Sequence, residues 1–432
     1  MSRARGVRAK TIPVARIVRC AGALAAVAAL ALALTAGPAT ASYKVIHTWG
    51  TPGTSGGQLE APLTLSLDGH GSLYVGDGTR VIQFGVTRPF PNSYVGKFVK
   101  EYSDRHLADG TWLGEIGIVR SLSADEEGDI WVVGANPSTN VASVYAFAPS
   151  GSYIGALTLA PGDTWTVTSD HHRRIFLTRS YPPGDGTGIR GFVDVYSRGN
   201  AFLFRWGTDL SIQPGALAFG PHGRRYVLDD DGIHVYTDRV RELVWGGTFS
   251  GLPLNNPIGI AVDPAGFVYV ADWGNHRVLK INSVGHVVAV LTAKPGLHSG
   301  GQPFAPGGLA VARTGQVFAG DLNSARIVEF APVGPETKIT FSPPGVAQFE
   351  FQGVSSTGRA AEKLTFECRI DARPWKDCST SHQTDKHGKP VYGIEYRGLR
   401  IGIHKFSVRA TGEDGNVDPT PAHRTVRIRA GA

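Results

Sequence analysis

Sulfur-containing residues are scarce in this chain of 432 residues. Its one methionine is the initiator, and its three cysteines are Cys20, Cys368 and Cys378. Two cysteines ten residues apart favour a disulfide formed in an oxidising compartment. The alternative is a zinc site that joins these two cysteines to His382 and His387, although the spacing matches no common zinc module.

Long apolar segments are also missing, apart from one near the N-terminus. Six basic and no acidic residues precede the Ala- and Leu-rich run 21–35, and Ala39-Thr40-Ala41 follows it. This order is typical of a secretory signal peptide, and the run is shorter than the ~20 residues of a spanning helix. We therefore expect a signal peptide at 1–41 with cleavage near Ala41, a secreted, extracellular protein, and no transmembrane segment in the mature chain. An uncleaved anchor is the alternative.

The mature chain has almost no excess of charge of one sign, because most of the positive excess lies in the expected signal peptide. The formal charge of +7 includes the six basic residues of 1–41, so the mature chain carries +1. A nearly neutral protein lacks the basic field that nucleic acid or an anionic membrane requires. We therefore expect no nucleic-acid partner.

What the chain does contain is an internal repeat. Residues 257–291 hold four short alternating strands, IGIAVD, FVYVAD, RVLKIN and HVVAVL, separated by the turn sequences PAG, WGNH and SVG. The first two strands recur in five further copies, and every copy has an aromatic residue at the same position. Intervals of 43 to 57 residues separate these aromatic residues, which is the length of a four-stranded propeller blade. The six residues are Tyr74, Trp131, Phe176, Tyr226, Tyr269 and Phe318.

The segment 257–291 resembles an NHL repeat, and six copies imply a six-bladed β-propeller over residues 42–332. The last repeat ends after its third strand, 326–331, whereas an unpaired strand at 44–50 opens the mature chain. We predict that these two strands pair and close the ring, because pairing hides two exposed strand edges. The aromatic residues are expected to pack between neighbouring blades.

The pattern changes after residue 332. The sequences FECRIDARPWKDC and GIHKFSVRATGEDGNVDPTPAHRTVRI resemble Ig-like or fibronectin-like modules of secreted bacterial proteins. We expect an all-β chain in which a small β-sandwich at 333–432, with the disulfide as a structural bond, follows the propeller. Asp414, Asn416 and Asp418 suit a calcium site, but a hairpin turn is the simpler interpretation.

The loops of the repeats differ between the two faces of the expected propeller. All six turns between first and second strands have three residues, whereas the loops on the opposite face are longer and more varied. Function concentrates in such loops on a rigid scaffold, and aromatic residues with a few polar neighbours suit a sugar or peptide ligand. The candidate ligand-binding residues on this long-loop face are Trp112, Tyr181, Asp185, Arg190, Trp273, His276 and His298.

Aspartates end three of the second strands, and arginines open the third strands just across the loop. Because the pair recurs from repeat to repeat, we predict that it holds the loop in place and binds no ligand. The pairs are Asp77 with Arg80, Asp272 with Arg277, and Asp321 with Arg326.

Related six-bladed propellers include lactonases and amidating lyases, which hold a metal at the central channel. The segments expected at the channel entrance here contain no His or carboxylate, although Glu60, Glu115 and Asp163 lie nearby. Because a catalytic metal needs about three protein ligands, we expect no cofactor, metal or catalytic residue. The sequence therefore predicts a binding protein for an extracellular glycan, peptide or protein. The alternative is a metal-dependent propeller hydrolase or lyase, lactonase-like or amidating-lyase-like.

Overall fold

The computed structural model describes residues 43–429 with eleven gaps, and the expected signal peptide at 1–41 lies outside the described residues. The gaps are 87–95, 107–111, 126, 160–161, 182–189, 211–213, 355–363, 380–381, 385–388, 413–414 and 419. In the described part, helix is limited to the 3-10 turns η1 (Pro221–Gly223) and η2 (Trp273–Asn275). No helix among these residues is long and apolar enough to cross a membrane.

The first three four-stranded antiparallel sheets follow one another along the chain. The first contains β2 (Pro62–Leu67), β3 (Ser72–Asp77), β4 (Arg80–Gly85) and β5 (Lys97–Tyr102). The second contains β8 (Ile118–Ala124), β9 (Ile130–Ala135), β10 (Ala142–Phe147) and β11 (Tyr153–Ala156). The third contains β12 (Asp163–Ser169), β13 (Ile175–Ser180), β14 (Gly191–Tyr196) and β15 (Phe202–Leu210). The hairpin β6 (Asp104–His106) and β7 (Trp112–Glu115) precedes the second sheet.

Three further sheets of four strands continue the series. The fourth contains β16 (Leu217–Phe219), β17 (Arg224–Asp229), β18 (Gly232–Thr237) and β19 (Val240–Gly246). The fifth contains β22 (Pro257–Val262), β23 (Val268–Asp272), β24 (Arg277–Ile281) and β25 (Val287–Leu291). The sixth contains β26 (Pro306–Val311), β27 (Val317–Asp321), β28 (Arg326–Pro332) and β1 (Tyr43–Trp49). A short hairpin, β20 (Thr248–Phe249) and β21 (Leu252–Pro253), joins the fourth and fifth sheets.

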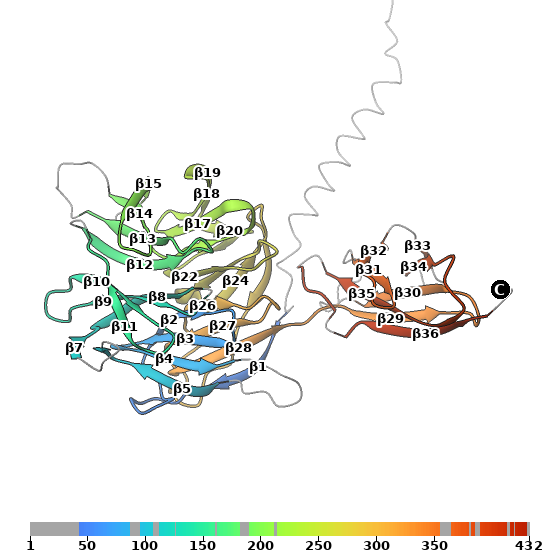
Figure 1. Cartoon of the computed structure of the whole chain (residues 1–432), viewed down its shortest axis with the longest axis horizontal. Coiled ribbons are helices and arrows are strands. Elements are labelled where there is room, and N and C mark those ends of the chain that lie inside the picture. The colour runs from blue at the N-terminus through green and yellow to red at the C-terminus, as the bar shows by residue number, and fades with distance from the viewer. Residues whose placement is uncertain are drawn as a thin grey trace, which may run out of the picture. The chain divides into compact units, whose positions relative to one another are not determined.

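The six sheets are arranged around a common centre (Figure 1). Their first strands contact one another in the cyclic order β2, β8, β12, β16, β22, β26 and back to β2. This arrangement is all-β and propeller-like, and it places the first strand of every sheet at the middle of the molecule.

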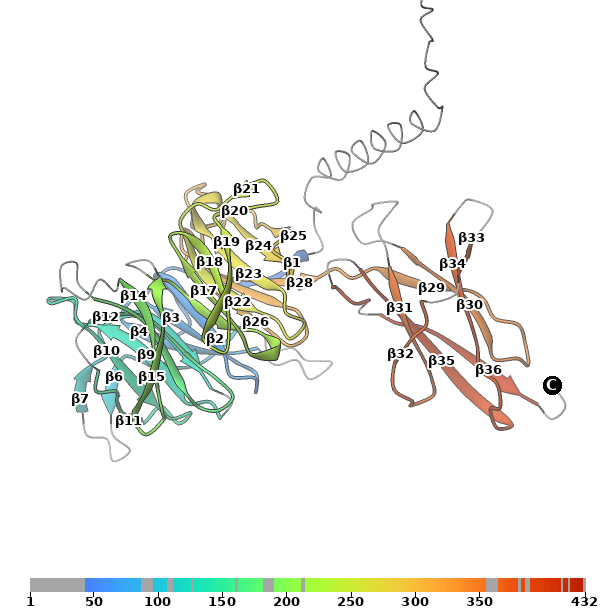
Figure 2. The same cartoon turned by 90° about the horizontal axis from the view of Figure 1, so that it is seen from above.

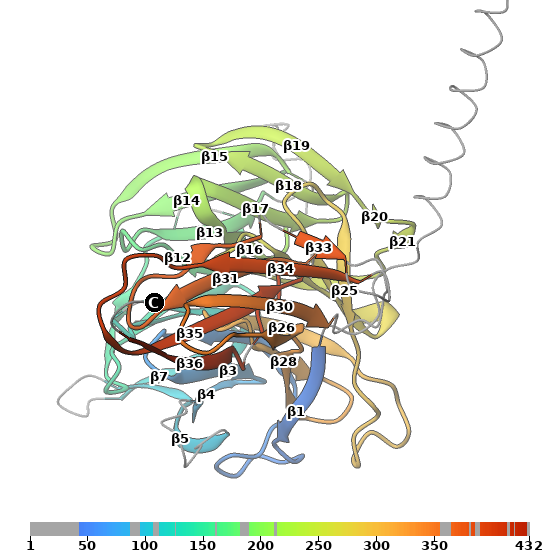
Figure 3. The same ribbon diagram turned by 90° about the vertical axis from the view of Figure 1, so that its right-hand side faces the viewer.

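The N-terminal strand closes the sixth sheet, as the sequence predicts. β1 pairs antiparallel with β28, with Tyr43 opposite Pro332 and Trp49 opposite Ile327, and all three overall views place the two strands side by side (Figures 1, 2 and 3). Without β1, the hydrogen-bonding edge of β28 would be exposed to solvent. Trp49 lies edge-on to Phe84 of the first sheet and Phe318 of the sixth, with ring centroids 6.3 and 6.0 Å away.

The repeated aromatic residues lie between neighbouring sheets, as expected. All six are buried. Tyr74 of the first sheet belongs to a core cluster with Ile130 and Val132 of the second, and Phe318 of the sixth belongs to one with Leu65 of the first. The aromatic residues of the third, fourth and fifth sheets likewise share clusters with the following sheet. The core of this region is therefore a series of sheet-to-sheet layers that returns to its starting point.

The repeated Asp–Arg pairs hold the loops between sheets, as predicted. Asp272 is fully buried; its Oδ2 accepts a hydrogen bond of 2.7 Å from Arg277 Nε, and its Oδ1 accepts one of 2.7 Å from the backbone N–H of Asn255. Arg277 also donates to the carbonyl of Pro253. Asp77 with Arg80 and Asp321 with Arg326 make equivalent contacts to the loops that precede their sheets. Both charges of each pair are thus used within the protein.

Two further four-stranded sheets form the C-terminal module, residues 336–428 (Figure 2). One has the order β29 (Glu336–Phe341), β30 (Gln348–Val354), β34 (Pro390–Glu395), β33 (His382–Thr384). The other has the order β32 (Lys376–Asp377), β31 (Thr365–Ile370), β35 (Gly402–Thr411), β36 (Ala422–Ile428). Side chains from both sheets share one core, in which the rings of Phe349 and Phe406 stack at 4.0 Å.

The disulfide predicted between Cys368 and Cys378 is present in this core. Because both sulfurs are bonded to each other, neither is a thiolate ligand, and the alternative zinc site loses these two ligands. In the expected turn, Asp418 accepts hydrogen bonds from the backbone N–H groups of Thr337 and Thr420. Its carboxylate therefore has a structural use, whereas Asp414 lies outside the described residues.

Candidate functional site

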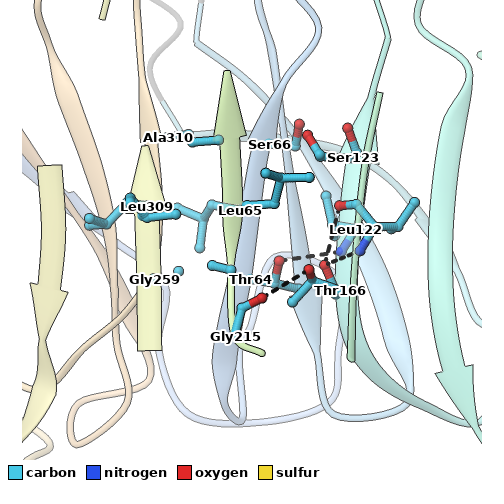
Figure 4. A pocket seen from close by; sticks show the side chains of 18 of the residues that line it. Thr64, Leu65, Ser66, Leu122, Ser123, Thr166, Gly215, Gly259, Leu309 and Ala310 are labelled. Carbon is cyan, nitrogen blue, oxygen red and sulfur yellow. Dashed lines mark hydrogen bonds between the residues drawn. The ribbon is translucent and has the colours of Figure 1, made fainter. Parts of the chain in front are cut away.

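A cavity of about 570 Å³ lies at the centre of the six sheets. The first strand of every sheet, or the residues just before it, contributes to its wall, through residues 63–67, 120–123, 165–168, 215–219, 258–260, 262 and 308–311. Figure 4 shows this lining from close by. A volume of this size is in the range of small-molecule binding sites.

Hydroxyl side chains from β2, β8 and β12 line one part of the cavity. On the inner edge of β8 and β12, backbone N–H groups donate to hydroxyl groups of the preceding sheet. Thr64 Oγ1 accepts one from the N–H of Leu122 at 3.3 Å, and Ser121 Oγ accepts one from the N–H of Val167 at 3.2 Å. Further along, Thr166 Oγ1 donates to the carbonyl of Gly215 at 3.2 Å (Figure 4). This part of the wall is polar but uncharged.

Glycine residues allow close approach of the first strands on the other side of the cavity. A Cβ atom on Gly308 would lie 2.5 Å from Thr64 Cα, and one on Gly259 would lie 2.7 Å from the carbonyl oxygen of Gly307. Leu65 and Leu309 fill the wall beside them (Figure 4). The cavity therefore combines an apolar side with a hydroxyl-bearing side.

Arg120 is the one charged residue among the described residues that line the cavity. Its Nη1 donates to Asp163 Oδ1 at 2.8 Å, and its Nη2 donates to Asn140 Oδ1 at 2.7 Å. The guanidinium lies over the ring of Trp165, with Cζ 5.4 Å from a ring centroid, and Trp165 Nε1 donates to Ser180 Oγ at 3.0 Å. These contacts fix the orientation of both the cation and the indole.

We call Arg120, Asp163 and Trp165 the channel-mouth cluster. Asp163 is the first residue of β12, and Arg120 is the third residue of β8, so the cluster lies where the chain enters the first strands from the inter-sheet loops. Leu63 of the first sheet and Ile258 of the fifth stand at the positions that correspond to Arg120 and Trp165, and both are exposed to solvent. Ile118, two residues before Arg120 on β8, is exposed as well. An arrangement of this kind offers a positive group, an aromatic surface and apolar contacts around a polar cavity, which suits ligand binding.

The residues nominated from the long loops lie outside this lining. Trp273 is the first residue of the turn η2, and His276 follows its last residue. The Nδ1 of His276 lies 3.1 Å from the carbonyl oxygen of Phe304. Tyr181 packs on Phe192 and accepts a hydrogen bond of 2.7 Å from Arg205, which gives it a structural contact.

Arg190 and His298 are exposed, and none of these five residues borders the cavity. Trp112 begins β7, but its side chain and the whole of Asp185 lie outside the described residues. A ligand role for the seven residues stays a prediction.

The sequence analysis missed Arg120 and Trp165 as site residues. A signal was available, because both stand in the entrance segments of the first strands, which were compared only for metal ligands. The role of these two residues depends on a contact between sheets, because the partner of Arg120, Asp163, lies 43 positions further along the chain.

One group of described residues has the composition of a metal site. Asp229, Asp231 and His234 lie around the turn between β17 and β18, with ligand atoms within 4.8 Å of one another. His234 Nε2 lies 2.9 Å from Asp229 Oδ1, and its buried Nδ1 has no hydrogen-bond partner. Because metal-bound histidines usually donate their second nitrogen to a partner, this group fits a buried Asp–His pair better than a metal centre. It replaces the Asp–Arg pair of other sheets.

Comparison with known proteins gives one family match, in which residues 254–281 match the NHL repeat. No curated protein sequence matches the chain. Similar solved structures include the extracellular domain of a putative hybrid two component system from B. thetaiotaomicron, at 13% identity over 90% of this chain and 57% of that chain, with a TM-score of 0.40. This chain therefore spans little more than half the length of that domain.

Two enzymes are also among the similar structures. A gluconolactonase from Xanthomonas campestris is 12% identical over 67% of this chain and 99% of its own, with a TM-score of 0.46. Virginiamycin B lyase from Staphylococcus aureus is 11% identical over 72% of this chain and 95% of its own, with a TM-score of 0.40. At such similarity none of these proteins assigns an activity to this chain. The chain is thus an all-β, propeller-like protein with one segment that matches the NHL repeat.

Proposed function

We propose that this protein is a secreted glycan-binding protein whose ligand site is the channel-mouth cluster of a six-bladed NHL-type β-propeller. In this proposal the propeller comprises residues 42–332, an Ig-like β-sandwich comprises 333–432, and the leader 1–41 is removed on secretion. Six four-stranded sheets in cyclic contact and the pairing of β1 with β28 support the blade count.

The observation that carries the proposal is the position of Arg120 and Trp165 at the mouth of a hydroxyl-lined cavity. Sugars present hydroxyl groups and apolar C–H faces together, and the cavity offers hydroxyls such as Thr64 and Ser66 alongside leucines such as Leu65. An indole that is held in place adds an apolar surface without a large loss of side-chain entropy. A short peptide is the second ligand class that such a surface accommodates.

The test combines a screen with matched variants. The full chain is screened on glycan and peptide arrays, and the affinity for the best neutral glycan is measured by calorimetry. We expect Trp165→Ala and Arg120→Gln each to lower this affinity at least tenfold, whereas Trp273→Ala, which removes an exposed indole of the outer loops, changes it less than twofold. Unchanged thermal melts of the three variants establish that the folds are intact.

Two results would count against the proposal. Loss of binding in Trp273→Ala with full binding in Trp165→Ala moves the site to the outer loops. A stoichiometric metal, lost in chelator together with hydrolysis of lactones or cleavage of amidated peptides, replaces the binding role with a metal-dependent hydrolase or lyase.

A further inference from the structure

Charge is distributed unevenly along the chain. Residues 333–432 contain 15 Lys and Arg against 11 Asp and Glu, whereas residues 42–332 contain 22 against 25. The C-terminal region therefore carries +4 and the preceding region −3, although their sum is nearly neutral. The total charge of the mature chain hides a basic module.

The strand register collects several of these cations on one face of the sheet β32–β31–β35–β36. Residues directly opposite each other on antiparallel strands point to the same face. Arg369 on β31 lies opposite Ser407 on β35, and Lys405 and Arg409 are each two residues from Ser407 along β35. Arg427 on β36 lies opposite Ile403, which is two residues before Lys405, so all four cations point to the same face. The alternate residues of these strands, among them Phe406 and Val408, form the core. We call Arg369, Lys405, Arg409 and Arg427 the basic face.

An aromatic residue orders two of the four cations. The guanidinium groups of Arg369 and Arg409 both lie over the ring of Trp375, each with Cζ 4.4 Å from a ring centroid. Arg409 Nε also donates to Glu367 Oε2 at 2.8 Å. Arg369 Nε is buried without a hydrogen-bond partner. The stack therefore holds two planar guanidinium groups in place on this face.

The other two cations have their charges available. Lys405 and Arg427 are exposed, and neither forms an ion pair with any described residue. His423 lies on the same face, opposite Ser407, with Nδ1 2.9 Å from Ser407 Oγ. Burial, and then the charges of Lys405 and Arg369, lower the pKa of His423, which is the response of an imidazole to a positive field.

We propose that the basic face binds an anionic polysaccharide. A sheet face that carries several arginines suits a long chain with repeated carboxylate or sulfate groups, because guanidinium groups bind such oxyanions through two parallel hydrogen bonds. Same-face residues along a strand are about 7 Å apart, so Lys405 and Arg409 span roughly 14 Å and contact several sugar units at once. This second contact surface is independent of the channel-mouth cluster.

Other polyanions fit the basic face less well. Nucleic-acid bases need free aromatic faces on which to stack, and the ring of Trp375 is already in contact with the guanidinium groups of Arg369 and Arg409. Glu367 and Asp377 also belong to this sheet face and reduce its field, which favours a polymer of lower charge density than nucleic acid. Binding to a membrane surface is favoured by several apolar side chains that can insert into it. Among the described residues of these strands, Ile403 is the one aliphatic side chain on the basic face.

The probes are polygalacturonate, neutral dextran, a DNA duplex and vesicles of anionic phospholipid, each titrated into the full chain at low and high salt. We expect binding to polygalacturonate that weakens with salt, and no binding to dextran on this face. The double variant Lys405→Glu/Arg427→Glu is expected to lose at least tenfold in affinity. A matched control, Lys338→Glu/Arg397→Glu, makes the same charge change at exposed positions outside this face and is expected to lose less than twofold.

Three outcomes overturn the proposal: no binding of the unmodified chain to polygalacturonate, equal losses in the two double variants, or tighter binding to DNA or vesicles than to the polysaccharide. Dextran sulfate serves as a further arm that distinguishes sulfate from carboxylate as the preferred group. Trp165→Ala leaves this binding unchanged, so failure here and failure of the channel-mouth proposal are distinguishable.

Discussion

Removal of the Trp49 side chain tests whether the N-terminal strand holds the ring of sheets together. Trp49 lies at the end of β1 and contacts Phe84 of the first sheet and Phe318 of the sixth. A fully enclosed indole buries about 200 Å², and a part-buried one about half of that. At about 25 cal/mol per Å², Trp49→Ala lowers the free energy of unfolding by about 2–3 kcal/mol.

Trp245 provides the matched control, because it is also part-buried and is also followed by glycine. It packs on Tyr226 and Phe249 near its own sheet, with ring centroids 5.7 and 6.3 Å away, so its contribution does not depend on β1. We expect Trp49→Ala and Trp245→Ala to shift the midpoint of urea unfolding, followed by far-UV circular dichroism, by similar amounts. Deletion of residues 42–50 should have a still larger effect.

The refuting result is a Trp49→Ala protein that unfolds with the midpoint of the unmodified chain while Trp245→Ala unfolds earlier. A deletion of residues 42–50 that melts unchanged leads to the same conclusion. In either case β1 would be an accessory strand, and the contacts among the first strands would have to hold the ring by themselves.

Two further predictions concern charged groups. Arg277→Met leaves the buried carboxylate of Asp272 without its cation, so the free energy of unfolding should fall by roughly 3 kcal/mol. Arg224→Met, which breaks a more exposed pair, should lower it by less than about 1 kcal/mol. Equal losses in the two variants would contradict the structural role of the repeated pair. The hydrogen bond that His404 donates to the carboxylate of Asp371 raises the pKa of His404. This histidine therefore stabilises the fold fully below its unfolded pKa of about 6.5 and loses that effect as the pH rises through its folded pKa. The stability difference between the unmodified chain and His404→Gln should therefore be larger at acidic than at alkaline pH, and a difference independent of pH would refute the pairing.

The repeat architecture was predictable because its determinants are local and recur. An aromatic residue such as Tyr269 returns once per sheet, and an Asp–Arg pair such as Asp272 with Arg277 spans a single hairpin loop. The pairing of β1 with β28 followed from a strand missing at one end of the chain and an extra strand at the other. Each of these features is visible without knowledge of how neighbouring sheets are placed.

The central cavity was not predictable in the same way. Its hydroxyl lining depends on bonds such as that from the N–H of Leu122 to Thr64, which join different sheets 58 positions apart. Arg120 likewise acquires its orientation from Asp163 and Trp165 of the next sheet. Local sequence patterns do not reveal which residues of neighbouring sheets are in contact. The sequence therefore pointed to the long loops, whereas the best-defined polar site lies between the first strands.

The seam between β1 and β28 also sets an order of events during synthesis. His47 on β1 and Glu329 on β28 are 282 positions apart, and their side chains meet at 2.9 Å. The N-terminal strand therefore leaves the ribosome long before its partner exists, whereas most other strands find a neighbour within one hairpin. Because closing so long a loop is entropically costly, we expect this seam to form last, and the unpaired edge of β1 to be the part of the nascent chain most in need of a chaperone.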